Sequence, residues 1–397
     1  VSQSSATYNI HYGTEDQLPD AIIEGFEGVG NTPAYRGLAY VVIEDFPLAA
    51  YGNRIPNFTF EVKRKVLASS VLDTQPVEDL IKGMVMIPGS GEFVYDTVVQ
   101  TKISGADVGG NWVQQGNSNK INQHNVSNKA DILVALDQLE NTCPNVEWVA
   151  LVVTWFGNSL DAGACTIYPA VEYKVGAITQ PDSWAVAGKT RATAIQITLD
   201  IEGNPTYGGT PSDATIVRAL QELKSRGYNV ILYPLVFMDM AGKPWRGEIT
   251  GTPTNVSNFF TKTDGYNAFI NHYANLTKDY IDAFVIGSEL KGLTSVKDGS
   301  NNFPAVTQLV SLAATVKGIV SSGVKVTYAA DWSEYHHETT GWYNLDPLWA
   351  SPNIDFIGID AYFPLTDEPQ SGYDVQKIID GWTSGEGYDW VYTDPAR

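Results

Sequence analysis

The chain has 397 residues, 43% of them hydrophobic, and a formal net charge of −20 at pH 7. This length and composition are typical of a globular protein that can hold two or three domains with a sizeable core. The acidity argues against a nucleic-acid partner, because phosphate binding needs clustered Lys and Arg. No run is apolar enough to predict a membrane-spanning segment. The start at Val1, with no signal peptide after it, is consistent with a processed or truncated product.

Residues 1–65 are predicted to form a β-rich segment. The stretches Tyr8–Gly13 and Ala39–Phe46 favour strands, and Phe58–Lys63 alternates at period two as a half-buried strand does. Several glycines over residues 25–33 predict a loop between the first two strands. The segment is too small for an independent core, so we expect it to be one edge of a larger β-domain.

Part of this segment resembles a known structural module. Ala34–Leu48, AYRGLAYVVIEDFPL, followed by Tyr51–Val62, YGNRIPNFTFEV, resembles a tail-hub segment of large tail-tip proteins of siphophages and gene transfer agents. In those proteins the segment helps build the β-structured hub that closes the tail tube. The resemblance implies contacts with other tail-tip proteins and with copies of this chain in a ring. An ordinary β-meander is the alternative interpretation.

Residues 66–146 are interpreted as a connecting region that ends in an amphipathic helix over Lys129–Glu140. Its Gly-Ser-Gly at residues 89–91 lacks the Gly-Lys-Ser/Thr ending of a phosphate loop. Cys143 and Cys165 are too few for a disulfide scaffold or a cysteine-rich zinc site. They flank one predicted strand and could pair, although two buried free thiols are the favoured state.

From residue 147 to 397, apolar runs alternate with helical patterns. Runs near residues 150, 233, 285, 327 and 358 predict buried parallel strands, and a further strand is considered near 195. Pro234 predicts a break in the hydrogen-bond ladder of its strand. The alternation indicates an α/β fold with a (β/α)8 TIM-barrel-like domain. Eight strands close such a barrel, so we expect its C-terminal strands to be missing from this chain.

Acidic and aromatic residues follow the ends of these runs, where barrels of this class keep their active sites. Sugar hydrolysis uses two carboxyl groups together with aromatic faces that stack on the sugar rings. We therefore predict Glu289 as a catalytic residue, against the alternative of a loop acid paired with Lys291 or Arg246. The candidate substrate-binding residues are Trp155, Asp239, Trp245, Arg246, Tyr328, Asp331, Trp332, Glu334, Asp360 and Tyr362.

Other functions of these residues are also considered. Asp331 and Glu334 could instead be capping or solvated loop acids. His336 and His337 are adjacent and project in different directions, so they do not predict a shared metal ion. We expect neither a metal nor another cofactor.

The second half of the chain carries another resemblance. The motifs Ile286–Leu290, Tyr328–Glu334 and Phe356–Leu365 resemble the barrel-like domain of gene transfer agent tail proteins, and also the retaining mannanase-type glycoside hydrolases of the large (β/α)8 clan. In that clan the acid/base is a Glu after the fourth strand, which the resemblance assigns to Glu289. The positions around Asp331, Trp332 and Tyr362 match those that line the sugar cleft.

The clan's nucleophile, a Glu at the end of the seventh strand, has no counterpart here, because Glu386 has no strand before it. The sequence therefore predicts a tail-tip or baseplate hub component, located in a virion or a released particle. Its glycosidase-like barrel would bind a host surface glycan or peptidoglycan, and cleavage is left open. The alternative is a free-standing retaining glycoside hydrolase acting on a β-linked polysaccharide, which should show a signal peptide and a complete barrel.

Overall fold

The computed structural model describes residues 7–46, 48–51, 76–366, 372 and 374–383. The chain divides into two compact units, Val1–Thr74 and Gln75–Arg397. In the described part, no helix has the length and apolarity needed to cross a membrane. Cys143 and Cys165 are free and buried.

The first unit contains a small antiparallel ribbon. Strands β1 (Tyr8–His11) and β2 (Tyr40–Ile43) pair antiparallel, as the sequence indicated for this segment, and η1 (Leu48–Tyr51) follows. The expected loop between them also contains helix α1 (Ala21–Glu27). The Asp20 carboxylate starts this helix by accepting hydrogen bonds from the backbone of its first turn. The predicted strand over residues 58–63 lies outside the described residues.

The second unit is built on a half-barrel of parallel strands, in the order β16-β15-β14-β13-β6-β3. The short strand β7 (Ile167–Tyr168) pairs antiparallel with β6. The long apolar runs form strands because both of their faces are buried, as in sheets covered by helices. The parallel strands are β3 (Gly83–Met86), β6 (Trp148–Gly157), β13 (Asn229–Met238), β14 (Ala283–Ser288), β15 (Lys325–Asp331) and β16 (Gly358–Asp360).

Five of these strands are those predicted near residues 150, 233, 285, 327 and 358. The sixth, β3, lies within the region that the sequence indicated as a connection, and it makes β14 the fourth parallel strand in chain order. The strand considered near 195 is β12 (Ile195–Gln196), which pairs with β8 (Ala170–Val171) in a separate sheet. It is therefore not a barrel strand.

Pro234 interrupts the sheet on one side only. Strand β13 pairs with β6 in unbroken register from Asn229–Trp148 to Met238–Gly157. Its pairing with β14 is confined to Ile231 and Leu232. Because proline has no N–H to donate, the ladder toward β14 ends beside it. The predicted break is confirmed on that side.

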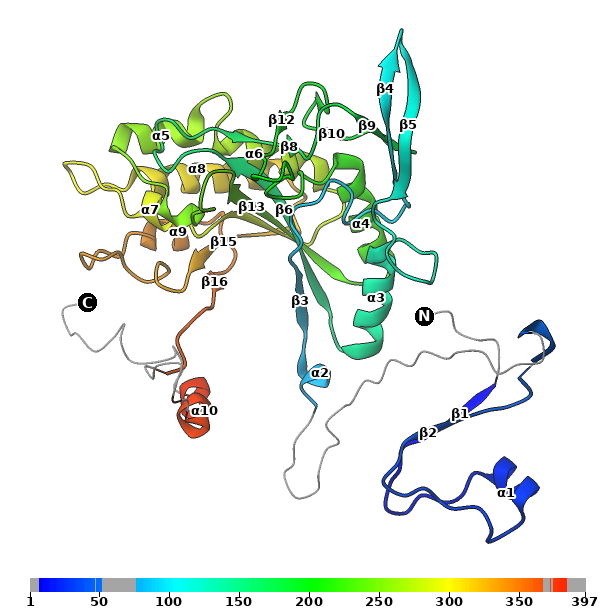
Figure 1. Ribbon diagram of the computed structural model, residues 1–397. Coiled ribbons are helices and arrows are strands. Elements are labelled where there is room, and N and C mark those ends of the chain that lie inside the picture. Colours follow the sequence, from blue (N-terminus) through cyan, green and yellow to red (C-terminus); the bar gives the residue numbers. More distant parts are fainter. Residues whose placement is uncertain (1–6, 47, 52–75, 367–371, 373, 384–397) are drawn as a thin grey trace. The chain divides into compact units, whose positions relative to one another are not determined.

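Helices connect the strands, and α4, α6 and α8 pack on β13, β14 and β15 to form the main core (Figure 1). The helices are α2 (Val77–Leu80), α3 (Asp131–Thr142), α4 (Asp213–Ser225), η2 (Arg246–Glu248), α5 (Pro253–Thr261), α6 (Tyr266–Thr277), α7 (Lys291–Thr294), α8 (Pro304–Ile319), α9 (Asp346–Trp349) and α10 (Val375–Thr383).

Two insertions follow the first two parallel strands. One carries the projecting hairpin of β4 (Thr101–Val108) and β5 (Asn111–Lys120), and the other contains β9 (Ala177–Gln180), β10 (Ala185–Val186) and β11 (Lys189–Thr190) (Figure 1). Strand β9 pairs with β4, so the two insertions form one structure at the carboxyl ends of the strands.

Candidate functional site

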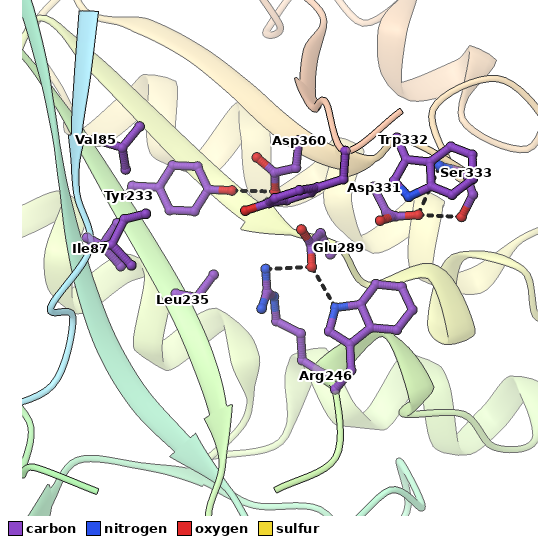
Figure 2. A pocket seen from close by; sticks show the side chains of 13 residues that line it. Val85, Ile87, Tyr233, Leu235, Arg246, Glu289, Asp331, Trp332, Ser333 and Asp360 are labelled. Carbon is purple, nitrogen blue, oxygen red and sulfur yellow. Dashed lines mark hydrogen bonds and ion pairs between the residues drawn. The ribbon is translucent and has the colours of Figure 1, made fainter. Parts of the chain in front are cut away.

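A cavity of about 620 Å³ lies toward the carboxyl ends of the parallel strands. All six strands, or the loops that follow them, contribute to its wall (Figure 2). This is the end at which (β/α) barrels keep their active sites. The lining residues are Val85, Ile87, Val152, Tyr233, Leu235, Trp245, Arg246, Glu289, Asp331, Trp332, Ser333, Asp360 and Tyr362.

Glu289 follows directly after β14 and is 7% exposed. Its φ of 51° lies in the left-handed region, which is unfavourable for a residue with a side chain. The register between β14 and β15 shifts between Val285 and Ser288, just before it. Such irregularities re-aim side chains and are frequent beside active sites. Here the local backbone turns the Glu289 carboxyl into the cavity.

The Glu289 carboxylate is held by two neighbours from the loop after β13. Its Oε2 accepts a hydrogen bond of 2.5 Å from Trp245 Nε1 and lies 2.8 Å from Arg246 Nη2. The same Arg246 donates to Ser288 O through Nε and to Ser288 Oγ through Nη2. The ion pair with Arg246, which was considered as an alternative to a catalytic role for Glu289, is therefore present, and it lies inside the cavity. Lys291 is directed elsewhere, to Ser333 Oγ at 2.6 Å.

A glycine permits this arrangement of the loop. A Cβ on Gly247 would approach the Trp245 ring to 2.4 Å, which is closer than real contacts allow. The indole therefore packs over position 247 while its Nε1 reaches Glu289. Any larger residue at 247 would displace the ring from the carboxylate.

Asp360 ends β16 and lines the same cavity. Its Oδ2 accepts a hydrogen bond of 2.6 Å from Tyr233 OH (Figure 2) and one of 3.1 Å from Ser288 Oγ. Ser288 Oγ also accepts a hydrogen bond from Arg246 Nη2, so Ser288 and Arg246 link Asp360 to Glu289. Burial raises the pKa of the Glu289 carboxyl, and the nearby charge of Asp360 raises it further. The Arg246 guanidinium and the hydrogen bond from Trp245 lower it.

The third acidic residue of the cavity belongs to a local turn. Asp331 ends β15, and its Oδ2 accepts a hydrogen bond of 2.9 Å from the backbone N of Ser333. Residues 332–334 form a turn, so Asp331 closes a local turn rather than capping a helix as considered from the sequence. The neighbouring Trp332 ring lies 6.1 Å from that of Phe363, and Tyr362 is 71% exposed. These rings give the cavity an aromatic rim.

Four residues predicted to bind substrate do not line this cavity: Trp155, Asp239, Tyr328 and Glu334. Trp155 packs on α6, with its ring 5.2 Å from that of Phe269. Successive side chains of a strand alternate between faces, and Trp155 is three positions from the cavity residue Val152. Tyr328 is likewise three positions from Asp331. Both therefore face the helices rather than the cavity.

The other two, Asp239 and Glu334, are acids whose carboxylates accept hydrogen bonds from other parts of the fold. Asp239 accepts hydrogen bonds from the backbone N of Thr198 at 3.2 Å and from Tyr168 OH at 3.4 Å, so it holds the second insertion. Glu334 is 2% exposed and bonds Tyr328 OH and the backbone of Asp331. It supports the turn that carries the cavity residues.

Sequence reasoning missed the polar residues Tyr233 and Ser288, which join Asp360 to Arg246. Ser288 directly precedes Glu289 in a motif that was recognised, so its proximity could have been inferred. Tyr233 is two positions from the cavity residue Leu235, so the alternation of side chains along β13 places both on the same face. Among the described residues, no group of three His, Cys, Asp or Glu side chains is arranged to hold a metal ion.

Comparison with known proteins gives a family match for part of this unit. Residues 264–397 match the family model of the GTA TIM-barrel-like domain. This segment begins just before α6 and includes Glu289, Asp331 and Asp360. No curated protein matches the chain.

Several solved structures share a distant similarity with the chain. One is a GH113 β-1,4-mannanase, with 16% identity over 65% of this chain and 62% of that chain and a TM-score of 0.35. Another is a GH113 β-mannanase from Alicyclobacillus acidocaldarius in complex with ManMIm, with 18% identity, 55% and 52% coverage and a TM-score of 0.33. A chitinase from Rhizomucor miehei matches with 14% identity, 60% and 58% coverage and a TM-score of 0.28. The chain spans less than two thirds of each.

Proposed function

We propose that this chain is a tail-tip or baseplate hub component of a siphophage or gene transfer agent, and that its half-barrel binds a host surface glycan or peptidoglycan. The observation that carries the proposal is that the segment matching the GTA TIM-barrel-like domain supplies the acidic wall of the cavity. A domain of this family indicates a phage-like particle as the setting. The β-rich first unit would join the hub through other tail-tip proteins and copies of itself.

The chemistry of the cavity supports a glycan as its ligand. Carboxyl, guanidinium, hydroxyl and indole N–H groups converge on its floor, and these groups can bond sugar hydroxyls. Trp332 and Tyr362 at the rim offer flat apolar faces on which pyranose rings can stack. A few polar groups inside a partly aromatic pocket are typical of small-molecule sites.

Cleavage is a further step of the proposal, with Glu289 as the acid/base. Burial raises the pKa of Glu289, which is the direction needed for a group that must hold a proton until it reaches a glycosidic oxygen. A retaining mechanism also needs a carboxyl nucleophile about 5–5.5 Å from the acid. We assign no described residue to that role, so binding is the primary function proposed.

Substitution of Glu289 tests the catalytic step. Glu289→Gln keeps the size of the side chain and an oxygen that can accept from Trp245 and Arg246, so fold and glycan binding should persist. Loss of proton transfer should lower any release of reducing ends from purified sacculi by about 10²–10⁴-fold. Equal release by the wild-type chain and the variant would rule out Glu289 as the acid/base.

Deletion of the first unit's predicted hub segment tests the structural role. Removing residues 1–65 should prevent incorporation of the chain into tails, as measured by immunoblotting of purified particles. The glycan cavity lies in the second unit, so the shortened chain should still bind sacculi. Normal incorporation would contradict the hub assignment and favour a free-standing hydrolase.

A further inference from the structure

The cavity has two walls of different chemistry. The aliphatic wall consists of Val85 on β3, Ile87 just after it, Val152 on β6 and Leu235 on β13. Among the described residues that line the cavity, every charged side chain comes from other elements, namely η2, β15, β16 and the position after β14. Val85 and Ile87 are 49% and 60% exposed although they line a cavity. Such side chains can be covered by a ligand that has an apolar part of its own.

The register of the sheet makes the aliphatic wall continuous. Tyr233 is paired with Val152 on the neighbouring strand, and paired residues of adjacent strands face the same side of a sheet. Leu235 is two positions further along β13 and shares that face. The pairing of β3 with β6 ends one residue before Ile87 and Val152, so these two lie at the same level. Three adjacent strands therefore present one apolar face to the cavity.

Tyr233 connects this wall to the acidic one. Its backbone lies in β13 beside Val152, whereas its hydroxyl points away toward Asp360 and donates a hydrogen bond of 2.6 Å to Oδ2 (Figure 2). Ser288 Oγ donates to the same oxygen at 3.1 Å. The Asp360 carboxylate is thus fixed one tyrosine side chain away from the aliphatic wall. A ligand group that lies along the Tyr233 ring can contact both.

An acetamido group has the same two-sided chemistry. Its amide N–H can donate to a carboxylate, and such charge-assisted hydrogen bonds are strong. Its methyl group is apolar and is stabilised by burial against aliphatic side chains. A sugar that carries only hydroxyls would instead place a hydroxyl against Val152 and Leu235 without a partner, which is unfavourable. The two walls therefore discriminate between these classes of sugar.

We propose that the cavity is a subsite for a 2-acetamido sugar, with the acetamido N–H on Asp360 and the acetamido methyl on the aliphatic wall. This inference rests on the proposed glycan-binding function and deepens it, because it names the class of sugar. Tyr233 acts as a positioning residue that holds the Asp360 carboxylate at the required distance from the wall. Glucans and mannans, which carry a hydroxyl at C2, fit this cavity less well.

Two tetrasaccharides that differ in one substituent test the proposal. Tetra-N-acetylchitotetraose and cellotetraose are both β-1,4-linked chains of gluco configuration, and they differ only in the group at C2. By isothermal titration calorimetry on the intact chain, we expect the affinity for the chitotetraose to be higher by about fourfold or more, the value of burying one methyl group. Equal affinities, or tighter binding of cellotetraose, would overturn the subsite.

Polar replacement of the aliphatic wall should remove the preference. Val152→Thr keeps the shape of the side chain and puts a hydroxyl in place of a methyl group. The affinity for the chitotetraose should then fall by about fourfold, while that for cellotetraose is maintained. Ile87→Thr tests the same wall at an exposed position if Val152→Thr does not fold. Ile195→Thr is the matched control, because this isoleucine on β12 is 47% exposed and lies outside the cavity lining, so both affinities should stay unchanged.

An unchanged preference in the wall variants would also contradict the subsite. These results are distinguishable from failure of the proposed function. Sacculus binding together with equal affinities for the two tetrasaccharides keeps the glycan role and removes the acetamido subsite. A preference for the chitotetraose in a chain that ignores sacculi leaves the subsite standing and removes the sacculus as the target. Failure to bind sacculi and both tetrasaccharides overturns the two proposals together.

Discussion

Glu334 is a buried acid whose hydrogen bonds stabilise the turn that carries the cavity residue Asp331. Its carboxyl accepts hydrogen bonds from Thr294 Oγ1 at 2.5 Å, Tyr328 OH at 2.9 Å and the backbone N of Asp331 at 3.1 Å. Burial raises its pKa to about 7 in spite of these donors. The Thr294 hydroxyl also lies 3.3 Å from Lys291 O, so it can turn to that carbonyl and accept the proton of neutral Glu334. The turn that presents Asp331 is thus anchored in either protonation state.

The raised pKa of Glu334 predicts a pH-dependent loss of stability. Between its ordinary value of 4.5 and about 7, the folded chain keeps a proton that the unfolded chain has released. Stability therefore falls as pH rises through this window, by about 3 kcal/mol in total, and changes no further above it. Urea unfolding of the wild-type chain and of Glu334→Gln from pH 4.5 to 8 measures the effect. The difference between the two should move in favour of the variant as pH rises, and a constant difference would contradict the assignment.

At the scale of elements, a buried ion pair joins the loop after β3 to the second insertion. Glu92, in the loop after β3, is 3% exposed and accepts two hydrogen bonds from Arg191, of 2.7 and 2.5 Å. Arg191 belongs to the second insertion, and its guanidinium lies 4.0 Å from the centre of the Tyr173 ring. The loop that follows β3 and supplies Ile87 to the cavity is thereby connected to the second insertion.

Breaking this pair should be costly because it leaves a buried charge without its partner. We expect Arg191→Met to lower the free energy of unfolding by about 3–5 kcal/mol. The double variant with Glu92→Gln should recover part of that loss. Lys82→Met is the matched control: its pair with Glu147 is exposed, with relative side-chain exposures of 61% and 59%, and the cost should be less than about 1 kcal/mol. Equal costs for the two substitutions would contradict this role of Arg191.

The elements also show what the sequence could predict. Long apolar runs such as β6 and β13 are recognisable because both faces are buried. The ends of the runs at β14 and β16 indicated where Glu289 and Asp360 would lie. Strand β3 was missed because it has four residues and is only half-buried. Trp155 and Tyr328 were misplaced because the alternation of faces was not applied along their strands. The convergence of Glu289 and Asp360 on one cavity depends on the curvature of the sheet, which no local pattern encodes.

At the scale of the whole molecule, the net charge opposes the approach to an anionic cell surface, whereas the short-range contacts of the cavity would favour binding to it. A net charge of −20 gives long-range repulsion from an anionic cell surface. Binding to such a surface must then come from short-range contacts, and the described cavity offers these through its aromatic rim and its polar floor. Salt screens the repulsion over about 10 Å at 0.1 M, so added salt should not weaken the binding. This behaviour is opposite to that of a protein that binds by its basic charge.

Co-sedimentation of the intact chain with purified host sacculi measures the glycan-binding role most directly. We predict that the wild-type chain and Glu289→Gln pellet with the sacculi at both low and high salt. Trp332→Ala combined with Tyr362→Ala should bind about tenfold more weakly per ring lost, because the stacking faces are removed while the fold is kept. Wild-type chain that stays in the supernatant, or equal pelleting of the aromatic variant, would contradict the assignment of this cavity as a glycan site.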